Sequence, residues 1–176
     1  MFSPRALGLE RGWPGRIEGD RVIQLAAQTL QAFFSGGGHA REHAEYPLVD
    51  VVLRAPVLRP PSVRIFDESG NFAFANPAAI RAADEEVQAP EGGGTLVSIR
   101  HEAAVIGAEG AIGGFTPLVE WVASSLAGAK ARDFALSLGP IVTTPDEHTP
   151  EGVDWERLVA IARANTRLYP GDVIAR

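Results

Sequence analysis

The sequence predicts a mainly β fold of the α+β class, a barrel- or sandwich-like body with few peripheral helices. Many short apolar segments are separated by glycine and proline, of which the 176 residues include 19 and 13. This spacing is typical of sheets built from short strands joined by turns. The hydrophobic fraction of 45% and the charged fraction of 22% are ordinary for a globular protein. The length allows one domain, or one domain with a small appendage.

The first part of the chain predicts a hairpin and a helix. Residues 15–26 alternate like a hairpin whose turn falls at Glu18-Gly19-Asp20. A helix is expected to follow and to end at the glycines 36–38. In a second interpretation, Asp20 is the N-cap of a helix that begins at Arg21.

A linker is expected to separate this part from the main body. Residues 48–58 are rich in valine and leucine and predict a strand that Pro56 breaks or ends. The segment RPPSVR at 59–64 favours extended backbone, because residues before proline avoid the helical region. We therefore expect an N-terminal α/β appendage with its linker at 1–60 and a main domain at 61–176.

The main body predicts strands and one clear helix. The strands are expected at 95–106, 115–125 and 139–145. The helix is expected at 154–166, where Asp154 is a plausible N-cap and apolar residues recur on one face. A turn and a last strand are expected in the closing YPGDVIAR.

Composition excludes several functional classes. The formal net charge of −6 argues against nucleic-acid binding, which needs a basic face. The absence of cysteine excludes thiol catalysis, disulfides and cysteine-based zinc sites. No apolar run has the length of a bilayer span, so no membrane partner is expected. The N-terminal MFSPRALGLERGWPG lacks the apolar core of a signal peptide, and we expect a cytoplasmic protein.

Two carboxylates lie inside apolar, strand-like segments. Glu102 belongs to LVSIRHEAAVIG, where Arg100 falls on the same strand face, and Glu120 belongs to FTPLVEWVASS. Two inward carboxylates on neighbouring strands would bind a hard cation or act as acid and base. A solvated strand face explains them equally well. Lys130, the only lysine, either orients an anionic substrate or is simply solvated.

Three weaker motifs favour structural explanations. HAREH at 39–43 matches the H-x-x-E-H pattern of inverted zinc peptidases, with His39 and His43 as ligands and Glu42 as base. Three glycines before it and Pro47 after it argue against the required helix, so a solvated loop is the default. GAEGAIGG at 107–114 lacks the spacing of a nucleotide fingerprint. Ser124-Ser125 has no nucleophile-elbow context.

Several segments together resemble the fumarylacetoacetate hydrolase family, bacterial type, over nearly the whole chain. They occur in the order seen in that family: YPLVDVVLRAPVLRPPSV (46–63), NPAAI (76–80), HEAAVIG (101–107), GGFT (113–116), KARDFALSLGPIVTTPDE (130–147) and NTRLYPGDVIA (165–175). The resemblance implies a mixed β-roll and a homodimer. It also implies hydrolysis, decarboxylation or tautomerisation of 2-keto and β-diketo acids, with Mg²⁺ or Ca²⁺ on four carboxylates stabilising an enolate.

Transferred residue by residue, the resemblance implies a degenerate site. Ile65 stands where the family has its first aspartate ligand. The Glu-x-Glu ligand pair becomes Arg100-His101-Glu102, so Glu102 alone remains. Glu120 takes the place of the fourth ligand, an aspartate, and Lys130 matches the active-site lysine. We expect Arg100 to pair with Glu102, and with Glu120, and so to replace the charge of the metal.

The resemblance also implies a shortened chain. The lid that carries the family's catalytic histidine is replaced by a brief DESGNFAFA at 67–75. The glycine-rich substrate loop that follows PGDVI in the family has no counterpart before Arg176.

Two functions follow from the resemblance and stay open. In the first, favoured, the protein is a catalytically impaired relative, a pseudoenzyme kept for binding, assembly or regulation. In the second, it is a reduced hydrolase, decarboxylase or tautomerase of a small 2-keto or acylpyruvate-type acid. Arg100 and Lys130 would then bind substrate, and Glu102 or Glu120 would be the base. No cofactor is expected, and Mg²⁺ or Ca²⁺ would bind weakly at Glu102 and Glu120 only if the site is partly retained.

Overall fold

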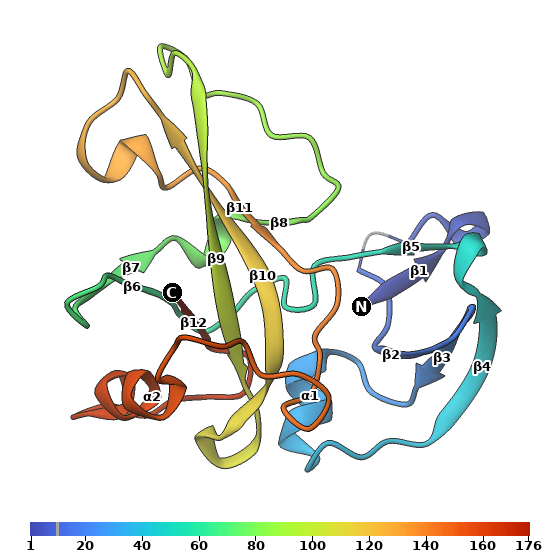
Figure 1. The fold of residues 1–176 in the computed structure, drawn as a ribbon. Coiled ribbons are helices and arrows are strands. Elements are labelled where there is room, and N and C mark those ends of the chain that lie inside the picture. The colour runs from blue at the N-terminus through green and yellow to red at the C-terminus, as the bar shows by residue number, and fades with distance from the viewer. Residues whose placement is uncertain (10) are drawn as a thin grey trace.

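The fold is known from a computed structural model, which describes residues 1–9 and 11–176. A seven-stranded mixed sheet forms the main body, in the strand order β7-β6-β12-β9-β10-β11-β8 (Figure 1). Its strands are β6 (Val63–Phe66), β7 (Phe72–Ala75), β8 (Ile80–Ala82), β9 (Leu96–Ile106), β10 (Ile112–Ala123), β11 (Leu136–Leu138) and β12 (Val173–Ala175). The β12–β6 and β11–β8 pairs are parallel, and the other pairs are antiparallel. The predicted mainly β class is confirmed.

The N-terminal residues form two smaller sheets beside the main one (Figure 1). One pairs β1 (Phe2–Pro4) with β5 (Val51–Leu53), and the other orders β2 (Gly15–Glu18), β3 (Arg21–Leu25) and β4 (Glu42–Pro47). The helix α1 (Leu30–Ser35) follows β3, and Thr29 caps it by accepting a hydrogen bond from Ala32 N. The predicted hairpin is confirmed, and the helix beginning at Arg21 is wrong. The division at residue 60 stays a prediction.

The long strands β9 and β10 carry the core. Alternate residues of β9 point to opposite faces, so Ala103 and Val105 enter one apolar cluster while Ala104 and Ile106 enter another. The first cluster contains Phe34 of α1, and α2 (Trp155–Arg163) covers the second. Asp154 is the predicted N-cap of α2 and accepts a hydrogen bond from Arg157 N. The first half of β9, up to Glu102, is not covered by apolar clusters on both faces, and most of its residues are exposed.

The short remaining helices are single 3₁₀ turns. They are η1 (Arg5–Leu7), η2 (Leu48–Asp50), η3 (Pro77–Ala79), η4 (Ala108–Gly110) and η5 (Gly128–Ala131). Within the described residues no helix combines the length and hydropathy of a membrane span.

The expected strand at 139–145 is wrong. In this segment only Thr143 pairs, through two backbone hydrogen bonds with Phe115 of β10. Pro140 and Pro145 have no N–H to extend the ladder. The approach is so close that a Cβ on Gly114 would lie 2.5 Å from the Thr143 carbonyl oxygen. The strand that joins the sheet is instead β11, three residues earlier.

Candidate functional site

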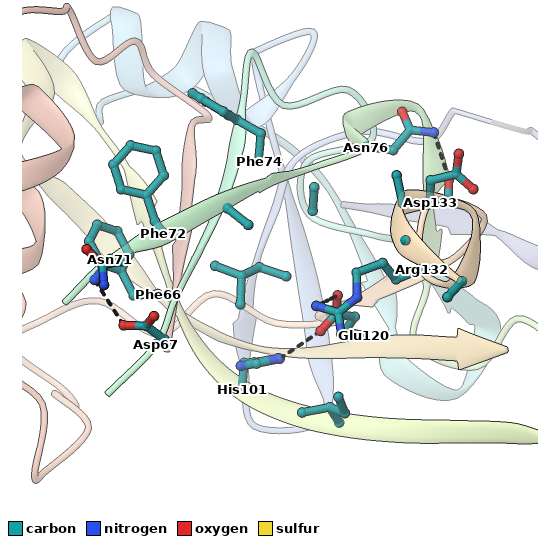
Figure 2. A pocket seen from close by; sticks show the side chains of 17 residues that line it. Phe66, Asp67, Asn71, Phe72, Phe74, Asn76, His101, Glu120, Arg132 and Asp133 are labelled. Atoms are coloured by element: carbon teal, nitrogen blue, oxygen red, sulfur yellow. Dashed lines mark hydrogen bonds and ion pairs between the residues drawn. The ribbon is translucent and has the colours of Figure 1, made fainter. Parts of the chain in front are cut away.

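A pocket of about 880 Å³ lies over the open half of the sheet (Figure 2). It is bounded by β6, β7, β9, β10 and the segment 128–133. On the sheet face of Glu120, its apolar wall includes Ile65, Ala73, Ala75 and Ile99. Phe66, Phe72 and Phe74 touch its edge, but their rings project to the opposite face of the sheet (Figure 2). Its polar side chains are Asp67, Asn71, Asn76, His101, Glu120, Arg132 and Asp133. We call this cavity the Glu120 pocket.

Glu120 is the most buried charged group of this pocket. Its side chain is 3% exposed, and it lies between two side chains that converge on it (Figure 2). Arg132 Nη1 is 3.3 Å from Glu120 Oε1, and His101 Nε2 is 3.6 Å from Oε2. A buried carboxylate needs such compensation, because desolvation strongly disfavours an isolated charge. Glu120, Arg132 and His101 are therefore one electrostatic unit.

The strand register explains why His101 and Glu120 meet. In the β9–β10 ladder His101 is opposite Leu118, and Ile99 is opposite Glu120. Opposite residues of an antiparallel pair project to the same face, and so do residues two apart. Ile99, His101, Leu118 and Glu120 therefore share one face. Leu118 fills the core, while the other three line the pocket.

The expected ion pairs of Arg100 are wrong. Arg100 and Glu102 fall between the pocket-facing residues of β9, so their side chains project from the other face. Both residues are exposed, and in the described chain neither side chain makes an ion pair or a hydrogen bond. Adjacent residues of a strand point to opposite faces, so a shift of one residue decides which side chains enter the pocket. The pocket-facing pair is Ile99 and His101.

Lys130 also lies outside the Glu120 pocket. Its side chain is 82% exposed and forms an ion pair with Asp133 at 2.7 Å. Arg132, two residues later, brings the cation to Glu120 instead. Asn76 Nδ2 donates to the Asp133 carbonyl oxygen at 2.8 Å, which ties this segment to the end of β7. The expected site residues Glu102, Arg100 and Lys130 are thus not gathered around Glu120.

The segment at 67–75 forms a hairpin turn and strand β7. Asp67 accepts hydrogen bonds from the backbone N–H groups of Ser69 and Asn71, which closes the turn between β6 and β7. Ile65 faces the pocket from β6, so the position compared with the first ligand is apolar there. Phe72 and Phe74 follow on β7, but they project to the opposite face of the sheet, where the Arg64 guanidinium lies over both rings.

Sequence reasoning missed His101 and Arg132. A usable signal for His101 was strand alternation, counted back from the apolar residues Val105 and Ala103, which places 101 on the same face. Arg132 offered no comparable signal, because it reaches Glu120 from a turn that only the tertiary fold brings near.

The pocket does not fit a hard divalent cation. Within the described chain no group of three or more histidine, aspartate, glutamate or cysteine side chains is arranged to hold a metal. Mg²⁺ and Ca²⁺ take about six or more oxygen ligands. Here the central carboxylate already faces the Arg132 guanidinium, and the neighbouring wall positions are Ile65 and Ile99. The residues present favour a charge-neutralised pair over a metal.

The HAREH segment is not a metal site. Glu42 and His43 begin strand β4 and not a helix or the expected loop. Adjacent strand residues project to opposite faces, so they cannot act from one helical face. Glu42 Oε1 forms an ion pair with Arg16 Nη2 at 2.6 Å. The zinc interpretation is therefore wrong.

Comparison with known proteins identifies the fold. No protein-family model and no curated protein matches the chain. Among solved structures, maleylpyruvate hydrolase from Sphingobium sp. SYK-6 matches with a TM-score of 0.79 at 20% identity, over 94% of this chain and 85% of that one. The same enzyme in complex with manganese(II) ion and pyruvate matches with a TM-score of 0.78, at the same identity and coverage. 5-Carboxymethyl-2-hydroxymuconate delta-isomerase from Mycobacterium smegmatis matches at 0.73 and 20% identity, over 93% of this chain and 81% of that one.

At this level of identity the comparisons establish the fold, and the site must be argued from its own residues. The predicted fumarylacetoacetate hydrolase-like mixed β-roll is confirmed.

Proposed function

We propose that the Glu120 pocket binds a small 2-keto or β-dicarbonyl acid without a divalent cation, and that the protein is impaired in the metal-dependent chemistry of similarly folded enzymes. The observation that carries this proposal is the Arg132–Glu120–His101 unit at the centre of the pocket. The fold neighbours support the ligand class, since one is a maleylpyruvate hydrolase that was solved with manganese(II) ion and pyruvate.

Arg132 supplies the positive charge of the pocket. Only its Nη1 is paired with Glu120, and its side chain is 51% exposed. A guanidinium has five N–H donors in a planar fork, so the remaining donors are available to a ligand carboxylate. Arginine is well suited to bind carboxylate in this bidentate way. It cannot replace a metal fully, because it offers no open coordination position to a keto-enol oxygen pair.

The apolar wall suits the carbon part of such an acid. Ile65, Ala73 and Ile99 line the pocket on the sheet face that carries Glu120, and ligand sites commonly combine an apolar lining with a few placed polar groups. The ligand would thus lie with its acid end at Arg132 and its carbon chain along β6 and β7.

Thermal stability tests this proposal. Oxalate, pyruvate and phenylpyruvate are each titrated with EDTA, and separately with Mg²⁺, Ca²⁺ or Mn²⁺. A ligand at ten times its Kd stabilises by about 1.4 kcal/mol, which raises the Tm of a chain of this size by roughly 3–6 °C. We expect the same rise with EDTA as with metal, and no rise with metal alone.

Two arginine variants provide matched controls. Arg132→Ala is expected to abolish the rise in Tm, whereas Arg100→Ala, on the opposite sheet face, is expected to retain it. A rise that requires Mg²⁺ or Mn²⁺ would contradict metal-free binding. If Arg132→Ala and Arg100→Ala showed the same ligand-induced rise in Tm, the ligand would not bind in the Glu120 pocket.

A further inference from the structure

A second cavity, of about 1000 Å³, lies beside the linker that precedes the main sheet. Four separate parts of the chain line it: residues before β2, the start of α1, the linker at 56–60, and η3 with the first residue of β8. Its volume is at the upper end of the range of about 300–1000 Å³ in which proteins hold small molecules. We call it the linker cavity. It shares no lining residue with the Glu120 pocket.

The charge of the linker cavity is opposite to that of the whole chain. Among the described residues, Arg11 and Arg59 are the only charged side chains that line it, and no acidic side chain does. Four other cavities of the structure are each lined by at least one aspartate or glutamate. The chain carries a formal net charge of −6. A cavity with two cations and no acid therefore favours a negatively charged ligand.

A third guanidinium group adds to this positive charge. Arg54 donates to Ser3 Oγ at 3.2 Å and to the Leu9 carbonyl oxygen at 3.1 Å. Leu9 precedes Arg11 by two residues, so the Arg54 charge lies near the cavity. Uncharged oxygens orient a guanidinium without cancelling its charge. Within the described chain, none of Arg11, Arg54 and Arg59 forms an ion pair.

The rest of the lining is mainly apolar and well fixed. Leu58, Pro60 and Ile80 are among its apolar residues, which we call the apolar floor. Proline fixes the backbone angle φ, which limits the freedom of the linker. Gln31 Nε2 donates to the Arg59 carbonyl oxygen at 3.3 Å and so ties the linker to α1. The backbone of Arg59 is thus held in place, while its exposed guanidinium is available to a ligand.

We propose that the linker cavity binds small organic phosphates, with Arg11 and Arg59 holding the phosphate group and the apolar floor holding the organic part. A phosphate monoester carries a charge of about −1.5 to −2 at pH 7 and offers three strong acceptor oxygens. Two guanidinium groups match this charge, and each can donate two parallel N–H bonds to phosphate oxygens. A monocarboxylate would neutralise only one of them. The bound phosphate would join the N-terminal residues to the linker.

Calorimetric titration with phenyl phosphate tests this proposal. Inorganic phosphate and phenol, the two parts of the probe, are titrated separately under the same conditions. We expect phenyl phosphate to bind at least about tenfold more tightly than inorganic phosphate, because its ring buries apolar surface. We expect no saturable binding of phenol. Salt at about 1 M should weaken the binding of phenyl phosphate, because it screens exposed charges beyond about 3 Å.

Arginine variants assign the binding to the linker cavity. Arg59→Ala and Arg11→Ala are each expected to raise the Kd for phenyl phosphate at least about tenfold, the typical loss of one charge-assisted hydrogen bond. Arg59→Lys should recover part of the affinity, because it keeps the charge but not the planar fork. Arg41→Ala, an exposed arginine outside the cavity, and Arg132→Ala, in the Glu120 pocket, should leave the Kd unchanged.

The Tm of each variant without ligand shows whether it is folded, and exposed arginines can be truncated with little loss of stability. Absence of saturable binding, or an unchanged Kd in either Arg11→Ala or Arg59→Ala, would overturn the two-arginine site. Loss of binding in Arg132→Ala would place the phosphate in the Glu120 pocket instead. Inorganic phosphate that binds as tightly as phenyl phosphate would overturn the preference for organic phosphates.

Discussion

Replacing Leu118 with alanine is expected to lower the free energy of unfolding by about 2–5 kcal/mol. Leu118 is fully buried on β10 and packs in the core below the Glu120 pocket. The loss combines the transfer free energy of the removed carbons with the cavity that remains, because surrounding strands relax only partly. Urea unfolding with an unchanged m-value would measure it.

Val119→Ala is the matched control. Val119 is the next residue of β10, is only partly buried and projects to the opposite face. Its truncation is expected to cost less than half as much as that of Leu118. Equal losses would contradict the assignment of Leu118 to the main core.

Local patterns made much of the fold predictable. The alternation of residues 95–106 and 115–125 marks β9 and β10, whose long hydrogen-bonded pairing forms the centre of the sheet. The turn at Glu18-Gly19-Asp20 joins β2 and β3, and the Asp154 cap begins α2. Each of these depends on residues close in sequence, where periodicity and turn chemistry act directly.

The site was less predictable, since its geometry depends on strand facing and on tertiary contacts. The resemblance pointed to β9, β10 and Glu120, and residue type favoured Arg100 and Glu102. The strand register instead places Ile99 and His101 on the face of Glu120. A shift of one residue along a strand leaves its pattern intact and reverses its faces. Arg132 follows the 3₁₀ turn η5 and reaches Glu120 across the fold, a contact that no local signal records.

Removing the cation of the pocket is expected to destabilise the fold. Arg132→Ala leaves the Glu120 carboxylate buried beside His101 alone. Losing one partner of a fully buried pair costs about 3–5 kcal/mol, but Arg132 is half exposed and screened, so we expect about 1–3 kcal/mol. Guanidinium chloride would alter the ionic strength, so unfolding is followed in urea at fixed salt.

A double-mutant cycle isolates the interaction between Arg132 and Glu120. Glu120→Gln removes the buried charge while keeping the shape, so Arg132→Ala should cost little in that background. We expect a coupling energy of about 1–2 kcal/mol, within the range for residues in contact. If Arg132 acts by its charge, 1 M NaCl should reduce the coupling, since the Debye length falls to about 3 Å. If the stability losses of Arg132→Ala and Glu120→Gln simply add, the buried Glu120 carboxylate does not depend on Arg132. The pocket would then lack the charge-neutralised pair on which the proposed metal-free ligand binding depends.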